Sequence, residues 1–243
     1  MITKSLPSLF TIGNLFLGIV AIILVFNGNP ALAAVMVLIA MLLDGVDGRV
    51  ARALNVQSEF GKELDSLSDV ISFGVAPAFI IYVVAFQEMN PAAGWIVTAL
   101  FPICGALRLA RFNVISGVPG YFIGLPIPAA GGVLCTMALF QDHISNIILL
   151  IGTILLSLLM VSNIKYPNFK KVGIPKAAIW VIPIVVILAV VLALNSSPSV
   201  LTKLIFVPLV IYALYGLKKN VDTLFRRRRK QQREDVDTVK HEA

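Results

Sequence analysis

Long apolar stretches dominate this sequence and constrain its fold more than any other feature. Of the 243 residues, 58% are hydrophobic and only 14% are charged, outside the range of an ordinary soluble domain. Stretches that span, or nearly span, a hydrocarbon core occupy residues 8–27, 31–53, 63–87, 91–115, 127–141, 144–163, 176–195 and 199–217. The sequence therefore predicts an all-α, polytopic membrane bundle of about eight transmembrane helices.

Short connections rich in Asn, Gly, Ser and Pro separate these stretches, at residues 27–30, 90–91, 117–120, 173–175 and 195–198. No internal repeat and no second domain is visible. We expect one transmembrane domain at residues 1–217 and a flexible, basic cytoplasmic tail at 218–243. The fifth stretch is short and contains Gly131-Gly132, a pair of small residues that in membrane helices marks close packing.

The positive charges predict the orientation of the chain in a cell membrane. With the N-terminus inside, nearly all Lys and Arg residues fall on one face, in the loops 53–62, 112–126 and 164–175 and in the tail. Lys203 alone lies near the opposite face. We therefore expect cytoplasmic N- and C-termini, and the aspartate motifs described below share that face. The alternative that the first stretch is a cleaved secretory signal would leave an odd number of spans.

The net charge of +7 by itself also suits nucleic-acid binding. Much of the excess, however, lies at 226–230, directly after the last apolar stretch, where a basic run anchors a membrane protein and contacts anionic lipid headgroups. We therefore expect no nucleic-acid partner.

Cysteine and histidine are too scarce for most metal chemistry. Cys104 and Cys135 both lie in apolar runs and are expected to be buried free thiols. His143 and His241 are the only histidines, and neither neighbours another plausible ligand. A metal in this protein would therefore be bound mainly by oxygen, which disfavours zinc, haem and iron–sulfur chemistry.

Two aspartates end the second apolar stretch and two more open the third. Residues 44–52 read Asp-Gly-Val-Asp-Gly-Arg-Val-Ala-Arg, and on a helix positions 44, 47, 48, 51 and 52 share one face. In the third stretch, positions 61, 65, 68, 69 and 72 share a face that carries Asp65 and Asp69. A hairpin of these two helices brings four aspartates together.

Four converging carboxylates repel one another strongly unless cations neutralise them. Oxygen ligands without histidine suit Mg²⁺ or Mn²⁺, and hard cations of this kind favour phosphate, so the face predicts a phosphoryl-transfer site with a diphosphate substrate. One alternative is that Asp44 and Asp47 are solvated interface residues paired with Arg49, Arg52 or Lys62. Another is a cation transporter, although transport favours carboxylates near the bilayer midplane.

At these residues the sequence resembles the CDP-alcohol phosphatidyltransferase family, whose signature is D-x2-D-G-x2-A-R-x8-G-x3-D-x3-D. Every fixed position matches, at Asp44, Asp47, Gly48, Ala51, Arg52, Gly61, Asp65 and Asp69. The resemblance implies that the four aspartates surround two divalent ions, that Asp69 also acts as the base, and that the protein is a homodimer.

The same resemblance implies contacts with the CDP-lipid. It assigns them to Gly48, Ala51, Arg52 and Gly61, to Ser58, and to Pro7, Thr11 and Asn14 at the cytidine-facing start of the first helix. The last four residues have an ordinary alternative as helix caps or interhelical hydrogen bonds.

Outside the shared signature, residues 105–113, 124–130 and 165–170 resemble the membrane-embedded phosphatidylserine synthases of bacteria and archaea. This implies transfer of a phosphatidyl group from CDP-diacylglycerol to L-serine. Arg108 and Arg111 lie one turn apart and suit the serine carboxylate. Glycerol 3-phosphate or an inositol phosphate would attract the same arginines, and both residues also suit a purely anchoring role.

Overall fold

The computed structural model describes residues 2–53, 56, 58–114 and 121–167, and at residues 2–7, 46–53, 121, 165 and 167 it describes the backbone only. Its first helices are α1 (Ile2–Phe26) and α2 (Pro30–Ala53). A continuous helical rod follows, made of α3 (Glu59–Asp69), the π-helical turn η1 (Val70–Val75), α4 (Ala76–Ile81) and the π-helical turn η2 (Tyr82–Phe86). The rest comprises α5 (Pro91–Val114), β1 (Tyr121–Ile123), α6 (Ile127–Leu139), the 3₁₀ turn η3 (Gln141–His143), α7 (Asn146–Val161) and β2 (Lys165–Pro167).

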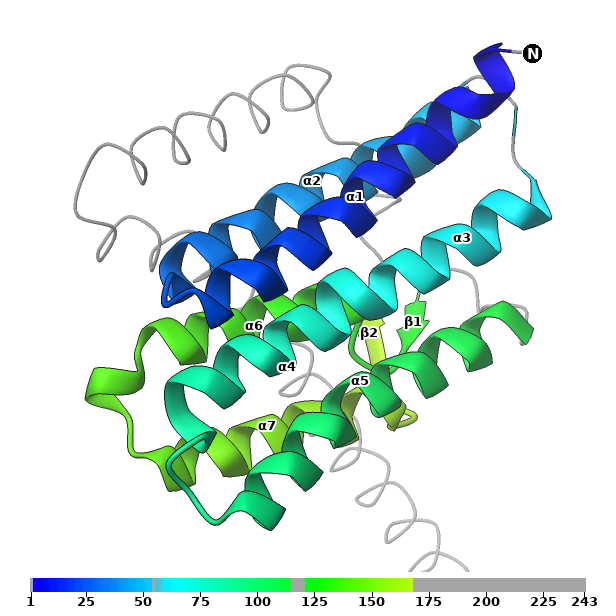
Figure 1. The fold of residues 1–243 in the computed structure, drawn as a ribbon. Helices are drawn as coiled ribbons and strands as arrows, with labels where there is room; N and C mark the ends of the chain where they lie inside the picture. Colours follow the sequence, from blue (N-terminus) through cyan, green and yellow to red (C-terminus); the bar gives the residue numbers. More distant parts are fainter. Residues whose placement is uncertain (1, 54–55, 57, 115–120, 168–243) are drawn as a thin grey trace, which may run out of the picture.

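The helices form a bundle in which α3 and α4 run between the α1–α2 pair and α5 (Figure 1). The start of α1, the end of α2, the start of α3, the end of α5 and both strands lie at one end of this bundle. We call it the site end, because the candidate site described below also lies there.

All six apolar stretches that fall in the described residues form helices close to their predicted bounds. Three helical segments in this part are long and apolar enough to cross a membrane, namely Ser8–Phe26, Glu59–Phe86 and Pro91–Val114. The predicted helices at 176–195 and 199–217, and the tail, lie outside the described residues. The mostly helical architecture is therefore confirmed, while the total of eight spans stays a prediction.

The α3 rod begins earlier than its apolar stretch because its first turn is capped. The Ser58 hydroxyl accepts a hydrogen bond from the Gly61 backbone N–H at 3.0 Å, and Glu59 places a carboxylate in the first turn. These polar residues extend the helix beyond the apolar run, so that Asp65 lies in its interior.

The structure adds one element that the all-α prediction did not include, because β1 and β2 form a small antiparallel sheet. Phe122 pairs with Tyr166, flanked by the pairs Tyr121–Pro167 and Ile123–Lys165. These strands follow α5 and α7, which pack against each other, so their loops emerge side by side. The described parts of the predicted loops 112–126 and 164–175 therefore lie side by side, while their place on one face of the membrane stays a prediction.

Close packing around α6 holds the centre of the bundle together. Most of this helix is buried, and at Gly131 the backbone of η1 approaches so closely that an added Cβ would lie 2.5 Å from the Phe73 carbonyl oxygen. The prediction that Gly131 marks a site of close helix packing is therefore confirmed. Cys104 and Cys135 are buried free thiols, as predicted.

Gly131→Ala should destabilise the protein, because its new methyl group meets a backbone carbonyl that cannot rotate away. We expect a loss of about 1–3 kcal/mol, as for other overpacked positions, measured by thermal unfolding in detergent. The matched control is Gly45→Ala, on α2, where no atom of the described residues lies within 4 Å of the added Cβ. Equal melting temperatures for the two variants would contradict this packing account.

Candidate metal and substrate site

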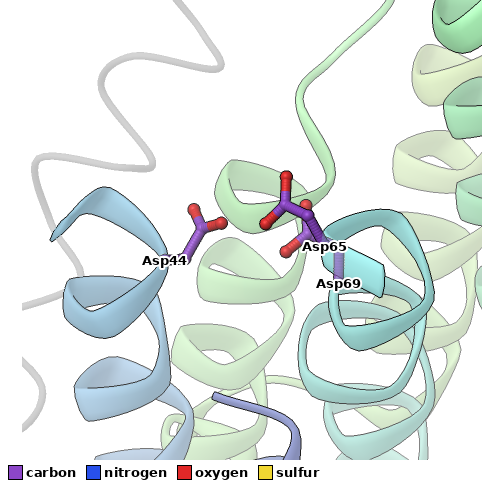
Figure 2. Close-up of side chains that lie close together, drawn as sticks. All are labelled: Asp44, Asp65 and Asp69. Carbon is purple, nitrogen blue, oxygen red and sulfur yellow. The ribbon is translucent and has the colours of Figure 1, made fainter. Parts of the chain in front are cut away.

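Three of the four predicted aspartates meet at the site end of the bundle. Asp44 projects from α2, and Asp65 and Asp69 project from α3, toward a common space (Figure 2). One carboxylate oxygen from each lies within 4.8 Å of the other two. Asp69 is the most buried, with 7% of its surface exposed, and Asp44 and Asp65 are half-buried.

Helix α1 positions the α3 carboxylates relative to α2. The Ser68 hydroxyl donates to the Thr11 carbonyl oxygen at 3.0 Å, and the Ser72 hydroxyl donates to the Asn14 carbonyl oxygen at 2.9 Å. Both bonds are buried, where a hydrogen bond is stronger than in water. Since α1 also packs along α2, these two serines fix the distance between Asp69 and Asp44.

A second set of contacts holds α3 from the side of α5. The Asn113 side-chain amide donates to the Ser66 hydroxyl at 2.9 Å and lies 3.4 Å from a Glu63 carboxylate oxygen. In return, the Lys62 ammonium donates to the Asn113 carbonyl oxygen at 3.3 Å. The sequence predicts no role for Asn113, although it is the last residue of the stretch 105–113 that resembles the phosphatidylserine synthases.

The chemistry of these donors fits a hard divalent cation. The three groups are all carboxylates, without thiolate or imidazole among them, and Mg²⁺ and Mn²⁺ prefer such oxygen ligands. Bound cations would also offset the mutual repulsion of the carboxylates. The structure thus supports a metal-binding aspartate cluster, while the identity and number of the ions stay predictions.

The other α2 residues of the signature lie on the helical backbone beyond Asp44. Asp47, Gly48, Ala51 and Arg52 all belong to α2, which continues to Ala53, so Asp47 follows Asp44 by one turn. Their side chains lie outside what the structure describes. The fourth metal ligand and these CDP-lipid contacts therefore stay predictions.

The weaker predictions for the CDP-lipid fall on residues with structural roles of their own. Ser58 caps α3 through the Gly61 N–H, so its alternative reading as a cap is confirmed. Thr11 and Asn14 accept the interhelical hydrogen bonds described above, through their carbonyl oxygens. The Asn14 side chain is fully buried, and its amide makes no hydrogen bond to the described part of the chain. Pro7 lies in α1, with its side chain outside that part.

The two arginines proposed for the acceptor have different surroundings. Arg108 is buried, with 6% of its surface exposed, and its guanidinium carbon lies 5.9 Å from the centre of the Phe112 ring. Arg111 is half-buried and donates to carbonyl oxygens at the end of α7 and to that of Ile123, the last residue of β1. Both belong to the last two turns of α5, at the site end.

Comparison with known proteins supports the same reading. Residues 4–191 match the model of the CDP-alcohol phosphatidyltransferase family. A CDP-diacylglycerol–serine O-phosphatidyltransferase of Helicobacter pylori is 40% identical over 219 residues, covering 87% of this chain and 89% of the relative. One of Bacillus subtilis is 43% identical over 166 residues, covering 68% and 92%, respectively. An archaetidylserine synthase of Methanothermobacter thermautotrophicus is 40% identical over 176 residues, covering 70% and 72%.

The family match spans more than half of the sequence and includes the two helices whose aspartates converge. These relatives are also similar along most of this chain, not only at the signature. The chain belongs to the CDP-alcohol phosphatidyltransferase family.

Proposed function

We propose that this protein transfers the phosphatidyl group of CDP-diacylglycerol to the hydroxyl of L-serine, which yields phosphatidylserine and CMP. The observation that carries the proposal is the convergence of Asp44, Asp65 and Asp69 at the family signature. A diphosphate substrate matches this site, because cations held by carboxylates neutralise phosphate oxygens.

The names of the relatives support serine as the acceptor. Those from Helicobacter pylori and Bacillus subtilis are named for transfer to serine, and the archaeal relative is named for archaetidylserine. The names thus differ in the lipid that is transferred, but all of them give serine as the acceptor. Glycerol 3-phosphate and inositol phosphates could accept the phosphatidyl group in the same type of reaction, so these are the acceptors to compare with serine.

Two divalent ions, Mg²⁺ or Mn²⁺, fit the ligand set Asp44, Asp47, Asp65 and Asp69. When bound, such ions supply positive charge to the diphosphate and to the leaving CMP. The residues of this chain do the rest. Gly48, Ala51, Arg52, Ser58 and Gly61, with Pro7, Thr11 and Asn14, are the proposed contacts for the CDP-lipid. Of the two arginines suggested for the acceptor, Arg108 is the proposed contact.

Asp69 is the proposed base. A carboxylate oxygen of Asp69 takes the proton of the serine hydroxyl as the serine oxygen bonds to the phosphorus that carries diacylglycerol. The bond from that phosphorus to the bridging oxygen of CMP breaks, and CMP leaves with the electron pair. The burial of Asp69 suits this role, because limited access of water favours transfer to serine over hydrolysis.

The arrangement in the membrane follows from charge and from the position of the site. We place the protein in the cell membrane as a multi-pass homodimer of eight-span chains, with a domain at 1–217, a cytoplasmic tail at 218–243 and both termini in the cytoplasm. Lys62 and Arg111 lie at the same end of the bundle as the aspartate cluster, which supports a cytoplasmic site end.

The acceptor is tested by measuring CMP release from purified protein supplied with CDP-diacylglycerol and Mn²⁺ or Mg²⁺. We expect release with L-serine and none above background with glycerol 3-phosphate or an inositol phosphate. Release that depends on one of the other acceptors would replace serine while leaving the family chemistry intact.

Asp69→Asn should lower kcat by about 100- to 10,000-fold, the usual contribution of a general base. Binding of CDP-diacylglycerol, followed by equilibrium titration, should remain close to that of the wild type. Asp142→Asn, an exposed acid outside the cluster, is the control and should keep full activity. Wild-type turnover by Asp69→Asn would remove this residue from the role of base.

The orientation is testable because both native cysteines are buried. Asn27→Cys lies in the exposed turn between α1 and α2, and Glu59→Cys lies at the exposed start of α3, at the site end. In intact cells, a membrane-impermeant maleimide should label Asn27→Cys only, and Glu59→Cys should react after permeabilisation. The reverse pattern would place the site end outside the cell.

A further inference from the structure

The last turn of α5 lies between α7 and α3 and forms hydrogen bonds with both of them. Toward α7, the Arg111 guanidinium donates from Nη1 to the Val161 carbonyl oxygen at 2.8 Å and from Nη2 to the Ser162 carbonyl oxygen at 3.0 Å. Its further acceptors are the Met160 and Ile123 carbonyl oxygens, at 3.4 and 3.3 Å, and Asn163 Oδ1 at 3.3 Å.

These bonds complete the C-terminus of α7. The last four carbonyl groups of a helix have no partner within it, and a cation there also suits the helix dipole. Leu158 O accepts from the Ser162 N–H at 2.9 Å, and Leu159 O accepts from the Leu125 N–H at 3.1 Å. The Arg111 guanidinium donates to the remaining two carbonyl oxygens, those of Met160 and Val161.

Gly124 allows the segment after β1 to approach this helix end. Its φ is +77°, a conformation that side chains with a Cβ rarely adopt, and an added Cβ would overlap the Met160 carbonyl oxygen. The same Cβ would lie 2.9 Å from Nη2 of Arg111. Gly124 and Arg111 therefore belong to one tightly packed contact between α5, β1 and α7.

These contacts bear on the function of Arg111. Nη1 and Nη2 together carry four N–H groups, and five acceptors already surround them. Binding a carboxylate with these groups would require the protein to exchange bonds at the end of α7.

On the opposite side, the same turn of α5 contacts the part of α3 that carries Asp65. The Asn113 amide donates to Ser66, the residue after Asp65, and Lys62, one turn before Asp65, donates to the Asn113 carbonyl oxygen. Ser66 also donates back to the Lys62 carbonyl oxygen at 3.1 Å.

We propose that the last turn of α5 is a positioning element for the aspartate cluster. Arg111 fixes this turn to the end of α7, and Asn113 fixes it to the turn of α3 that presents Asp65. Arg111 is accordingly a positioning residue and not a ligand of the acceptor. The proposal rests on the metal-binding role of Asp65 given above.

The test is a Mn²⁺ titration of the purified full-length protein, followed by its melting temperature, so that metal binding is read without activity. Asn113→Ala and Ser66→Ala each remove one partner of the same hydrogen bond. Each should raise the Mn²⁺ concentration for half-maximal stabilisation by about 10- to 100-fold, as is usual when the support of a ligand is lost. The double variant should be no worse than the more affected single variant, because both changes remove one interaction.

Asn29→Ala is the matched control. Asn29 lies in the turn between α1 and α2, at the far end of the bundle, and within the described residues its side-chain amide donates to the neighbouring Asn27 carbonyl oxygen. The melting temperature of this variant should respond to Mn²⁺ like that of the wild type.

Arg111→Lys keeps the positive charge but loses the planar guanidinium. It should therefore lower the melting temperature without metal and weaken the response of the melting temperature to Mn²⁺. The serine KM at saturating Mn²⁺ should stay unchanged.

An Asn113→Ala protein that titrates like Asn29→Ala would overturn the proposal. It would also fall if Arg111→Lys raised the serine KM while leaving the melting temperature and the Mn²⁺ response unchanged, since that result identifies an acceptor ligand. If Arg111→Lys does not accumulate in the membrane, Asn113→Ala and Ser66→Ala decide alone. A failure of the metal role itself is distinguishable, because Asp65→Asn would then respond to Mn²⁺ like the wild type.

Discussion

Carboxylates held close together in an apolar bundle are costly, and the rest of this structure depends on how that cost is met. Asp44, Asp65 and Asp69 stay together because α3 is held on two sides. The buried hydroxyls of Ser68 in α3 and of Ser72 in the adjoining η1 bond to the backbone of α1, and a polar network that includes Asn113 bonds α3 to α5. A cluster assembled by packing alone would separate under its own repulsion, so these directional bonds are what make a cation site possible.

The packing behind the aspartates serves the same purpose. Directly after Asp69 the helix widens into the π-helical turn η1, whose Phe73 carbonyl lies against Gly131 of α6. Such turns are frequent at functional sites, where they redirect side chains relative to a regular helix. Because α6 is itself buried among its neighbours, η1 has little freedom to move. The packing of η1 against α6 therefore fixes the direction of Asp69, the residue before η1.

Much of this could be predicted from the sequence, and the limits have physical causes. The helices within the described residues were predictable because long apolar runs admit few alternatives in a bilayer, and the aspartates because their spacing places them on helix faces. The β1–β2 pair was not predictable, since three-residue strands carry little pattern of their own. The contacts of Arg111 were also hidden, because four of its five acceptors are backbone carbonyls, which every residue possesses.

The arginine pair shows why the reaction is easier to infer than the acceptor. The signature aspartates indicate the reaction class, because their charge and convergence suit divalent cations and their motif belongs to the matched family. Arg108 and Arg111 have the same charge and lie on the same turns, so the sequence alone treats them alike. In the folded protein one is buried beside Phe112, whereas the other completes the end of α7. We therefore expect recognition of the acceptor to rest on Arg108, because the Arg111 guanidinium is already bonded at the end of α7.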